Sequence, residues 1–129
     1  MLSLVFPGQG SQYIGMGKDF SHNFPIANEV YSEVDDVLGF SLSKLIFNGQ
    51  IEELTLTKNA QPAIMVTSIA ILKTLEKEGF NIKKSKFVAG HSLGEYTALC
   101  ASGAISLADT AYILKMRGIF MQKAVSVGV

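Results

Sequence analysis

The stretch GHSLG at positions 90–94 constrains the fold of this chain more than any other feature. A short β-type run, residues 86–89, precedes it, and a helix of small residues follows directly. The pattern G-x-S-x-G in such a place is typical of a strained strand-to-helix turn that exposes the serine hydroxyl above a parallel sheet. Strand and helix approach so closely there that a Cβ on Gly90 or Gly94 would not fit. The stretch predicts an exposed nucleophile at Ser92 or, as the alternative, a tight turn whose serine only caps the helix.

The rest of the chain predicts two buried strands separated by helices. A strand over residues 2–6 ends at a glycine-containing turn, and a second strand is expected over 87–89. Hydrophobic spacing, glycine stops and a capping-box pattern at Ser106 and Asp109 predict the helices. The expected helices cover 23–38, 42–47, 51–56, 59–79 with Asn59 as N-cap, the stretch from the serine turn to about 103, and 106–124. Helices between strands indicate the α/β class, a parallel-sheet core with flanking helices.

Composition and charge argue against several classes of partner. The 129 residues carry 11 basic and 11 acidic side chains, so there is no charge excess of the kind that binds nucleic acid or an anionic membrane. The most apolar segment is too short to span a membrane, and the N-terminus lacks the basic region of a signal peptide. The single cysteine, Cys100, rules out an internal disulfide framework and suits a reducing compartment. We expect a cytoplasmic protein in which Cys100 packs as a small hydrophobic side chain.

A second glycine-containing loop, PGQGSQ at 7–12, follows the first strand and suits the same chemistry. Its glycines let the backbone come close to whatever lies above the sheet. A dinucleotide-binding loop does not fit, because G-x-G-x-x-G would need glycine at Tyr13. An oxyanion that develops beside Ser92 needs N–H donors, and the Leu93 amide at the start of a helix is the first. We expect the amide of Gln9 to be the second.

The last predicted helix carries a charged side chain within an apolar face. On a helical wheel Arg117 falls in the middle of that face, while Lys115 and Gln122 point the opposite way. A buried guanidinium keeps its proton, so it must reach water, pair with an internal acid or bind an anionic ligand. Arginine is well shaped to hold a carboxylate through both oxygens. The apolar face consists of Ile113, Met116, Phe120, Met121 and Ala124.

Three stretches together resemble the malonyl-CoA:acyl carrier protein transacylase family. They are FPGQGSQ at 6–12, GHSLGE at 90–95, and Arg117 within KMRG. AQPAI at 60–64 matches a weaker signature of the same family. The similarity covers essentially the whole chain, and it disfavours the helix-cap alternative for Ser92.

This resemblance implies a set of site residues and a reaction. Ser92 would be the acylated nucleophile, the amides of Gln9 and Leu93 would form the oxyanion hole, and Arg117 would bind the free carboxylate of the malonyl group. The implied enzyme is an acyltransferase of fatty acid biosynthesis with a ping-pong mechanism. Malonyl-CoA acylates the serine, coenzyme A leaves, and the phosphopantetheine thiol of acyl carrier protein takes the malonyl group. Neither a metal ion nor a permanently bound cofactor is implied.

The resemblance lacks one component, because the family's general base is a histidine well beyond position 129. Of the two histidines here, His91 is expected to diverge from its neighbour Ser92 at the sharp turn, and His22 to lie on the surface. The chain also ends in a small apolar segment, 124–129, like a chain cut within a larger protein. We expect residues 1–129 to be the N-terminal portion of the family's large, α/β-hydrolase-like subdomain, incomplete at the C-terminus. The ferredoxin-like small subdomain and the C-terminal remainder would be absent, and the chain alone nearly inactive.

Two other functions remain open. An esterase or thioesterase of the α/β-hydrolase type would share the turn at Ser92, but it would pass the acyl group to water and would give no reason for Arg117. Alternatively, the chain is a non-catalytic truncated fragment that binds acyl-CoA or acyl carrier protein without turnover.

Overall fold

The computed structural model describes residues 1–125, in which two parallel strands are accompanied by helices. The end of the small apolar segment, residues 126–129, lies outside the described residues. Strands β1 (Leu2–Phe6) and β2 (Ser85–Gly90) pair in parallel, with Phe6 opposite Gly90. The helices are α1 (Lys18–Asn23), α2 (Pro25–Leu38), α3 (Leu42–Asn48), α4 (Ile51–Thr55), α5 (Thr57–Lys77), the 3₁₀ helix η1 (Ile82–Lys84), α6 (Leu93–Ala101) and α7 (Leu107–Ala124). The predicted α/β class with a parallel sheet is confirmed.

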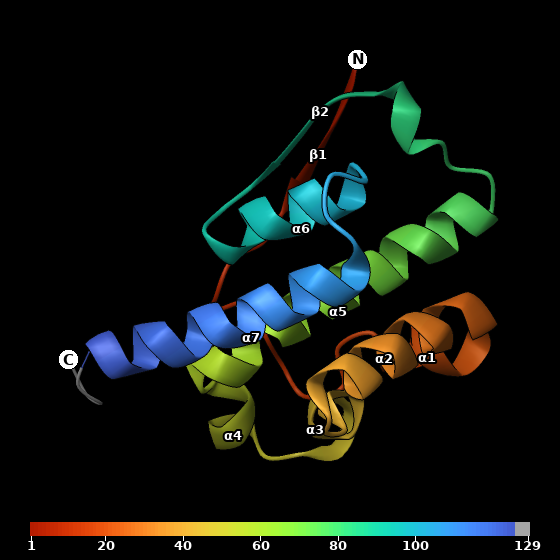
Figure 1. The fold of residues 1–129 in the computed structure, drawn as a ribbon. Helices are drawn as coiled ribbons and strands as arrows, with labels where there is room; N and C mark the ends of the chain where they lie inside the picture. The colour runs from red at the N-terminus through yellow and green to blue at the C-terminus, as the bar shows by residue number, and fades with distance from the viewer. Residues whose placement is uncertain (126–129) are drawn as a thin grey trace.

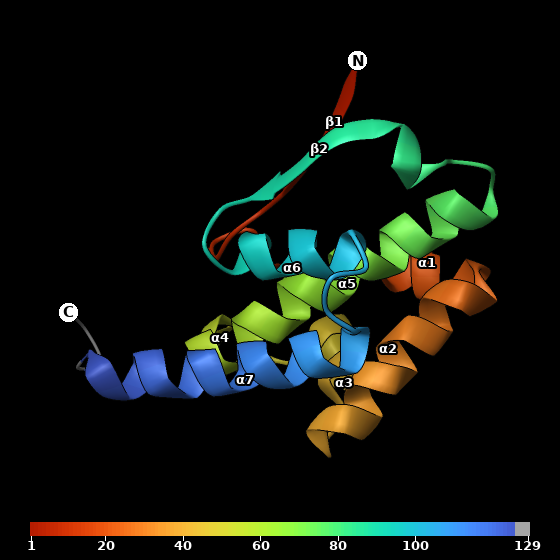
Figure 2. The same ribbon diagram turned by 45° about the horizontal axis from the view of Figure 1, so that its top comes forward.

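Helix α6 occupies the centre of the fold, between the sheet and the pair formed by α5 and α7 (Figures 1 and 2). Helix α2 packs against both α5 and α7, and α1 and α3 pack against α2. The core lies between these helices, where Val34, Met65, Ile69, Leu93 and Leu114 are at most 2% exposed. The order sheet, α6, then α5 and α7 places the start of α6 next to both long helices.

The two faces of the sheet differ in how they are covered. Phe6 points towards the helices and is buried. Val5 and Phe87 point the other way, and their side chains are 76% and 60% exposed. Within residues 1–125 the sheet is therefore covered by helices on one face.

Helix α5 begins before its predicted start. Thr57 is its first residue, and Leu56 precedes it without a capping side chain. Asn59, predicted as the N-cap, lies inside the helix instead. Its Nδ2 donates to the Glu53 carbonyl at 2.9 Å, and its Oδ1 accepts from Lys115 Nζ at 3.0 Å. The N-cap prediction was wrong because this side chain joins α5 to α4 and α7.

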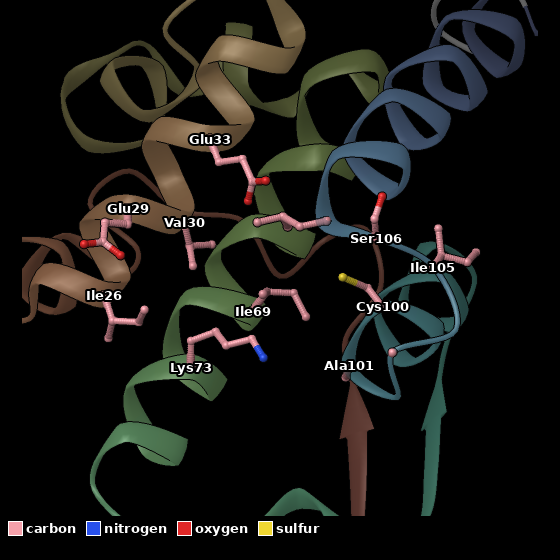
Figure 3. Close-up of a pocket in the computed structure, with 12 residues that line it drawn as sticks. Ile26, Glu29, Val30, Glu33, Ile69, Lys73, Cys100, Ala101, Ile105 and Ser106 are labelled. Carbon is pink, nitrogen blue, oxygen red and sulfur yellow. The ribbon is translucent and has the colours of Figure 1, made fainter.

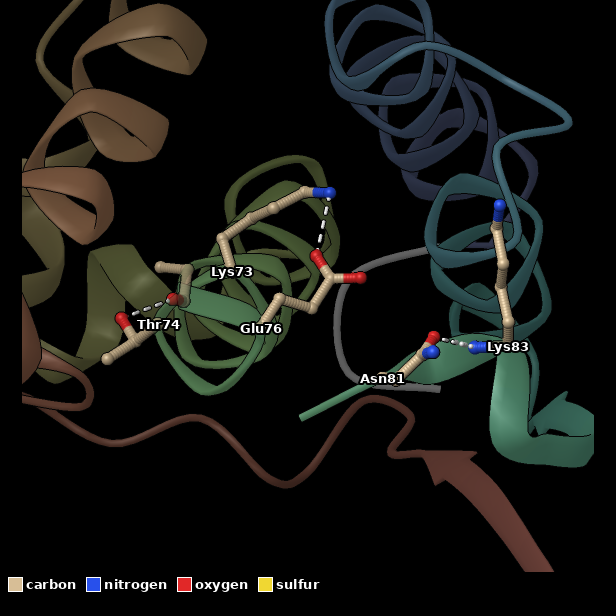
Figure 4. Close-up of polar contacts among 6 residues, drawn as sticks. Lys73, Thr74, Glu76, Asn81 and Lys83 are labelled. Carbon is tan, nitrogen blue, oxygen red and sulfur yellow. Dashed lines mark hydrogen bonds and ion pairs between the residues drawn. The ribbon is translucent and has the colours of Figure 1, made fainter. Parts of the chain in front are cut away.

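Short-range polar contacts hold the far end of α5 and the chain that leads to β2 (Figure 4). Thr74 Oγ1 donates at 2.9 Å to the carbonyl oxygen one turn earlier, and Lys73 pairs with Glu76 at 3.0 Å. After the helix, Asn81 Oδ1 accepts from the backbone N–H of Lys83 at 3.0 Å and caps η1. The capped η1 leads directly into β2 at Ser85.

Helix α7 buries a different face from the predicted one. Ile113, Phe120 and Met121 are 36%, 60% and 41% exposed. The helix instead buries Thr110, Ala111, Leu114 and Gly118. A Cβ on Gly118 would lie only 2.5 Å from Lys58 Cα, so glycine lets α7 cross α5 closely. The prediction was wrong because the helical wheel marked the large apolar side chains, whereas this close crossing requires small ones.

Candidate active site at Ser92

Ser92 lies at the turn between β2 and α6 in a conformation that serine rarely adopts. Its φ is 55° and its ψ is −112°, and it is the only non-glycine residue of 1–125 with a positive φ. Such a conformation costs on the order of 1–3 kcal/mol and persists only when the surroundings impose it. A Cβ on Gly90 would collide with the Gly94 carbonyl, and one on Gly94 would collide with the Phe6 carbonyl oxygen. The predicted close approach of strand and helix is confirmed.

The side chain of Ser92 does not cap the helix that follows it. Ser92 occupies the N-cap position of α6, yet it accepts no hydrogen bond from an amide of that helix. Its Oγ instead accepts a hydrogen bond from Arg117 Nη2 at 3.0 Å. Because the Ser92 side chain makes no capping hydrogen bond, the alternative in which this serine serves only as a helix cap is disfavoured.

The loop after β1 packs directly against this turn. The His91 amide donates to the Phe6 carbonyl at 3.2 Å. A Cβ on Gly8 would lie 2.9 Å from the His91 carbonyl oxygen, so a larger residue there would require this backbone contact to shift. One residue later, Gln9 Nε2 donates to Thr57 Oγ1 at 3.3 Å and joins the loop to the first residue of α5. The loop is thus held between the serine turn and α5.

The two amides expected to stabilise an oxyanion have no backbone acceptor among the described residues. Within residues 1–125, neither the Gln9 nor the Leu93 amide donates to a backbone carbonyl. Leu93 is the first residue of α6, where amides lack partners within the helix and the helix dipole favours negative charge. Gln9 follows Gly8, which contacts the serine turn. Both donors are therefore offered by segments that meet at Ser92.

Arg117 reaches this site from α7 and is half-buried there. Its Nη1 donates to Gln61 Oε1 at 2.7 Å, and its Nη2 donates to Ser92 Oγ at 3.0 Å. Its Cζ lies 5.4 Å from the centroid of the Tyr96 ring. Among residues 1–125 no carboxylate lies within ion-pair distance of Arg117. Pairing with an internal acid, one of the three outcomes open from the sequence, is not observed in the described part of the chain.

Neither histidine contacts Ser92 Oγ through a hydrogen bond within the described residues. His91 is exposed, and its ring packs over Gly8. His22 is exposed as predicted, and its ring meets Phe47 edge-on with centroids 6.3 Å apart. The site as described therefore contains a hydroxyl, amides and a guanidinium, and no imidazole placed to take the serine proton.

Two of the residues that contact Arg117 were not predicted from the sequence. Tyr96 lies in the first turn of α6, four positions after Ser92 at the N-cap, and this closeness in sequence is a signal that could have identified it. Gln61 lies in the AQPAI stretch, which resembles a family signature without indicating a role for this residue. No feature of the sequence pairs Gln61 with Arg117, because the pairing depends on how closely α5 and α7 cross.

A cavity of about 380 Å³ lies elsewhere, between α2, α5 and the connection from α6 to α7 (Figure 3). Its lining is mostly apolar and includes Cys100. Burial raises the pKa of the Cys100 thiol, so the thiol stays protonated and poorly nucleophilic near neutral pH. Neither Ser92 nor Arg117 lines this cavity. The expectation that Cys100 is a packing residue agrees with its half-buried position.

Residues 1–125 offer neither a membrane-spanning helix nor a metal-binding cluster. No described helix has the length and hydropathy needed to cross a membrane. No cluster of three or more His, Cys, Asp or Glu side chains suited to a metal ion occurs in the same residues.

Comparison with known proteins places this site in a family. The family described as acyl transferase domain matches residues 3–128. The malonyl CoA-acyl carrier protein transacylase of Bacillus subtilis (strain 168) is 50% identical over 127 residues, which are 98% of this chain and 39% of that protein.

Two solved structures have the same fold over nearly the whole chain. The acyl-carrier-protein S-malonyltransferase from Bartonella henselae superimposes with a TM-score of 0.95 at 56% identity, covering 99% of this chain and 41% of that one. A malonyl-transacylase in complex with its type II PKS acyl carrier protein gives a TM-score of 0.91 at 40% identity, covering 97% of this chain and 40% of that one.

The matches cover nearly all of this chain but only part of each relative. The chain spans about 40% of the length of the relatives that it matches. The matched residues include both glycine-containing loops, Ser92 and Arg117. The chain therefore belongs to the acyl transferase domain family.

Proposed function

We propose that this chain carries the acyl-accepting serine of a malonyl-CoA:acyl carrier protein transacylase. The observation that carries this proposal is the hydrogen bond between Arg117 Nη2 and Ser92 Oγ. It places a cation that can bind the malonyl carboxylate beside a hydroxyl that can attack the thioester. Ser92 Oγ attacks the thioester carbonyl of malonyl-CoA, the C–S bond breaks, and coenzyme A leaves as a thiol. The thiol of acyl carrier protein then attacks the serine ester, and Ser92 regains its proton.

The amides of Gln9 and Leu93 would receive the negative charge that develops on the carbonyl oxygen. Preorganised N–H donors of this kind are among the largest contributions to acyl-transfer catalysis, and the loss of one costs roughly 3–4 kcal/mol in enzymes of this type. The support here is that both amides lack backbone acceptors among residues 1–125, and that their segments pack against each other.

Arg117 would bind the free carboxylate of the malonyl group. The support is its lack of a carboxylate partner among residues 1–125 and its contact with the hydroxyl that is to be acylated. A hydrogen bond between charged groups is worth about 1.5–3 kcal/mol, so this one side chain can account for a preference for malonyl over acetyl groups.

The general base is proposed to come from outside residues 1–129. These residues would form the N-terminal portion of the large, α/β-hydrolase-like subdomain, without the ferredoxin-like small subdomain and the C-terminal remainder. The greater length of the relatives and the exposed sheet face at Val5 and Phe87 support this division, since parallel sheets are normally covered on both faces. The chain alone should then acylate Ser92 slowly.

The substrates and setting follow from the same proposal. Malonyl-CoA is the donor, coenzyme A the product, and acyl carrier protein the acceptor, with no permanently bound cofactor. The relative that is described in complex with its acyl carrier protein supports this choice of partner. We place the protein in the cytoplasm, in fatty acid biosynthesis.

Acceptor preference tests the proposal. The chain is incubated with labelled malonyl-CoA, with and without the phosphopantetheine form of acyl carrier protein, and Ser92→Ala serves as the control. The expected result is slow, serine-dependent transfer to the carrier protein. Release of free malonate at the same rate with and without carrier protein would indicate a thioesterase. Binding without any serine-dependent product would indicate a non-catalytic fragment.

A further inference from the structure

Gln61 is a buried polar residue that the proposed reaction does not yet use. It lies in α5 and is 1% exposed. A buried amide is costly unless both of its polar atoms have partners. Its Oε1 accepts from Arg117 Nη1 at 2.7 Å, whereas the one acceptor for its Nε2 among residues 1–125 is Met121 Sδ at 3.3 Å, a weak acceptor. The strong interaction of this side chain is therefore the one with Arg117.

The charge of Arg117 fixes the orientation of this amide. A guanidinium can only donate, so it must meet the oxygen of Gln61 and not the nitrogen. The amide nitrogen is thereby turned towards Met121. The Gln61 side chain therefore has one favoured orientation, with Oε1 towards Arg117 and Nε2 towards Met121. In this orientation Oε1 fixes the position of Arg117 Nη1.

Arg117 contacts Gln61, Ser92 and Tyr96 within residues 1–125, and of these three contacts the one with Gln61 alone is both directional and independent of the reacting group. The hydroxyl of Ser92 becomes an ester oxygen when the serine is acylated, and an ester oxygen of this kind is a poor acceptor. The Tyr96 ring, 5.4 Å from the guanidinium carbon, attracts the cation without fixing its rotation. The Gln61 hydrogen bond can therefore persist through the acyl-enzyme stage.

We propose that Gln61 is a positioning residue that holds Arg117 Nη1 and so leaves Nη2 aimed at the carboxylate of the incoming acyl group. This inference rests on the proposed function. A free arginine side chain must lose rotamer freedom when it binds a carboxylate, and an anchored one has already lost most of it. Gln61 thereby determines specificity for acyl groups that carry a carboxylate, without touching the substrate.

The experiment compares two variants that remove the hydrogen bond between Gln61 Oε1 and Arg117 Nη1, here called the anchor, with one variant that keeps it. Gln61→Met fills the same space without an acceptor, and Gln61→Asn retains an amide that is too short to reach Arg117. Gln61→Glu keeps an oxygen in the place of Oε1. The control is Thr74→Val in the same helix, about 20 Å further along its axis, where the hydroxyl bonds only its own helix (Figure 4).

Two measurements are made on each chain. The first is the rate of Ser92 labelling by malonyl-CoA divided by that by acetyl-CoA, measured by intact-protein mass spectrometry. The second is NMR of the arginine side chains, in which a guanidinium held at Nη1 shows slow rotation and separate Nη proton signals. The second measurement does not depend on activity.

The proposal predicts a malonyl-to-acetyl ratio that falls about ten-fold in Gln61→Met and Gln61→Asn, as expected for a lost charge-assisted hydrogen bond. It predicts separate Nη signals for Arg117 in the wild type, Gln61→Glu and Thr74→Val, and averaged signals in the other two variants. Thr74→Val should keep the wild-type ratio.

A wild-type ratio in folded Gln61→Met or Gln61→Asn, or an Arg117 side chain as restricted there as in the wild type, would overturn the proposal. Failure of the wild-type chain to label Ser92 would instead count against the proposed function, and the NMR result would still report on the anchor. The two failures are therefore distinguishable.

Discussion

Arg117 Nη2 donates a hydrogen bond to Ser92 Oγ over 3.0 Å, although the two residues are 25 positions apart in the sequence. Close backbone approaches at two places produce this contact. Gly90 and Gly94 let β2 and α6 approach closely around Ser92, and Gly118 lets α7 cross α5 closely enough for Arg117 to reach Ser92. The contact between the Ser92 hydroxyl and the Arg117 guanidinium thus depends on glycine at these three positions, because a side chain at any of them would prevent the close approach.

Replacement of Arg117 by alanine should separate malonyl transfer from acetyl transfer. We expect the rate of Ser92 labelling by malonyl-CoA to fall roughly 10- to 100-fold, because a charge-assisted hydrogen bond is worth about 1.5–3 kcal/mol. Labelling by acetyl-CoA, which has no carboxylate to bind, should change much less. Single-turnover mass spectrometry with each donor measures both rates.

The matched control for this change is Arg117→Lys, which keeps the charge but offers a single point of attachment. It should retain part of the malonyl preference. Equal losses with both donors in Arg117→Ala would contradict the role of Arg117 as the carboxylate-binding residue.

Replacement of Ser92 by glycine and by alanine should reveal the strain in the turn. Both variants lose the hydroxyl and its hydrogen bond to Arg117, but only glycine adopts a φ of 55° without strain. We expect the free energy of unfolding to be about 1 kcal/mol higher for Ser92→Gly than for Ser92→Ala. Urea unfolding measures the difference, and equal stability of the two variants would show that the turn is not strained.

Much of the fold could be predicted because its signals are local. The strand at Leu2–Phe6, the cap that Ser106 provides for the Asp109 amide, and the end of α2 at Gly39 with a φ of 70° were all predicted and are confirmed. Each depends on a few neighbouring residues and on one property, either hydrophobic spacing, a side-chain hydrogen bond or the freedom of glycine.

The features that could not be predicted depend on tertiary packing. The prediction of which face α7 buries was wrong because the close crossing at Gly118 requires small residues on the buried face. The prediction of Asn59 as an N-cap was wrong because its side chain bonds to Glu53 and Lys115, which belong to other helices. The contact of Gln61 with Arg117 was missed for the same reason.

Titration of Tyr31 should weaken the fold at high pH. Burial raises the pKa of the Tyr31 phenol to about 12 from 10.0, and its hydroxyl donates to Thr67 Oγ1 at 2.9 Å. Above about pH 10 the unfolded chain loses this proton while the folded chain keeps it, so the contribution is complete below pH 10 and is lost as the pH rises through 12. The loss should approach about 2–3 kcal/mol.

Urea unfolding of the wild type and Tyr31→Phe between about pH 8 and 11.5 checks this expectation. The phenylalanine variant should show a shallower decline in stability above pH 10. Tyr112→Phe is the control, since that side chain is 58% exposed and should leave the decline unchanged. Parallel pH profiles for the wild type and Tyr31→Phe would contradict the prediction.

Addition of free imidazole should accelerate the acylation of Ser92. No described residue is placed to take the serine proton, and a small base that diffuses into the site can partly replace a missing histidine. The rate of Ser92 labelling by malonyl-CoA should rise with imidazole concentration, measured against Ser92→Ala at each concentration. Rapid labelling without imidazole, at a rate that imidazole does not change, would show that the chain supplies its own base.

The most direct measurement is peptide mapping by mass spectrometry after incubation of the chain with malonyl-CoA and imidazole. The account predicts a malonyl group on Ser92, its absence in Ser92→Ala, and its removal when the phosphopantetheine form of acyl carrier protein is added. An unmodified Ser92, or malonyl groups found to the same extent in Ser92→Ala, would contradict the central claim that this hydroxyl is the acyl acceptor.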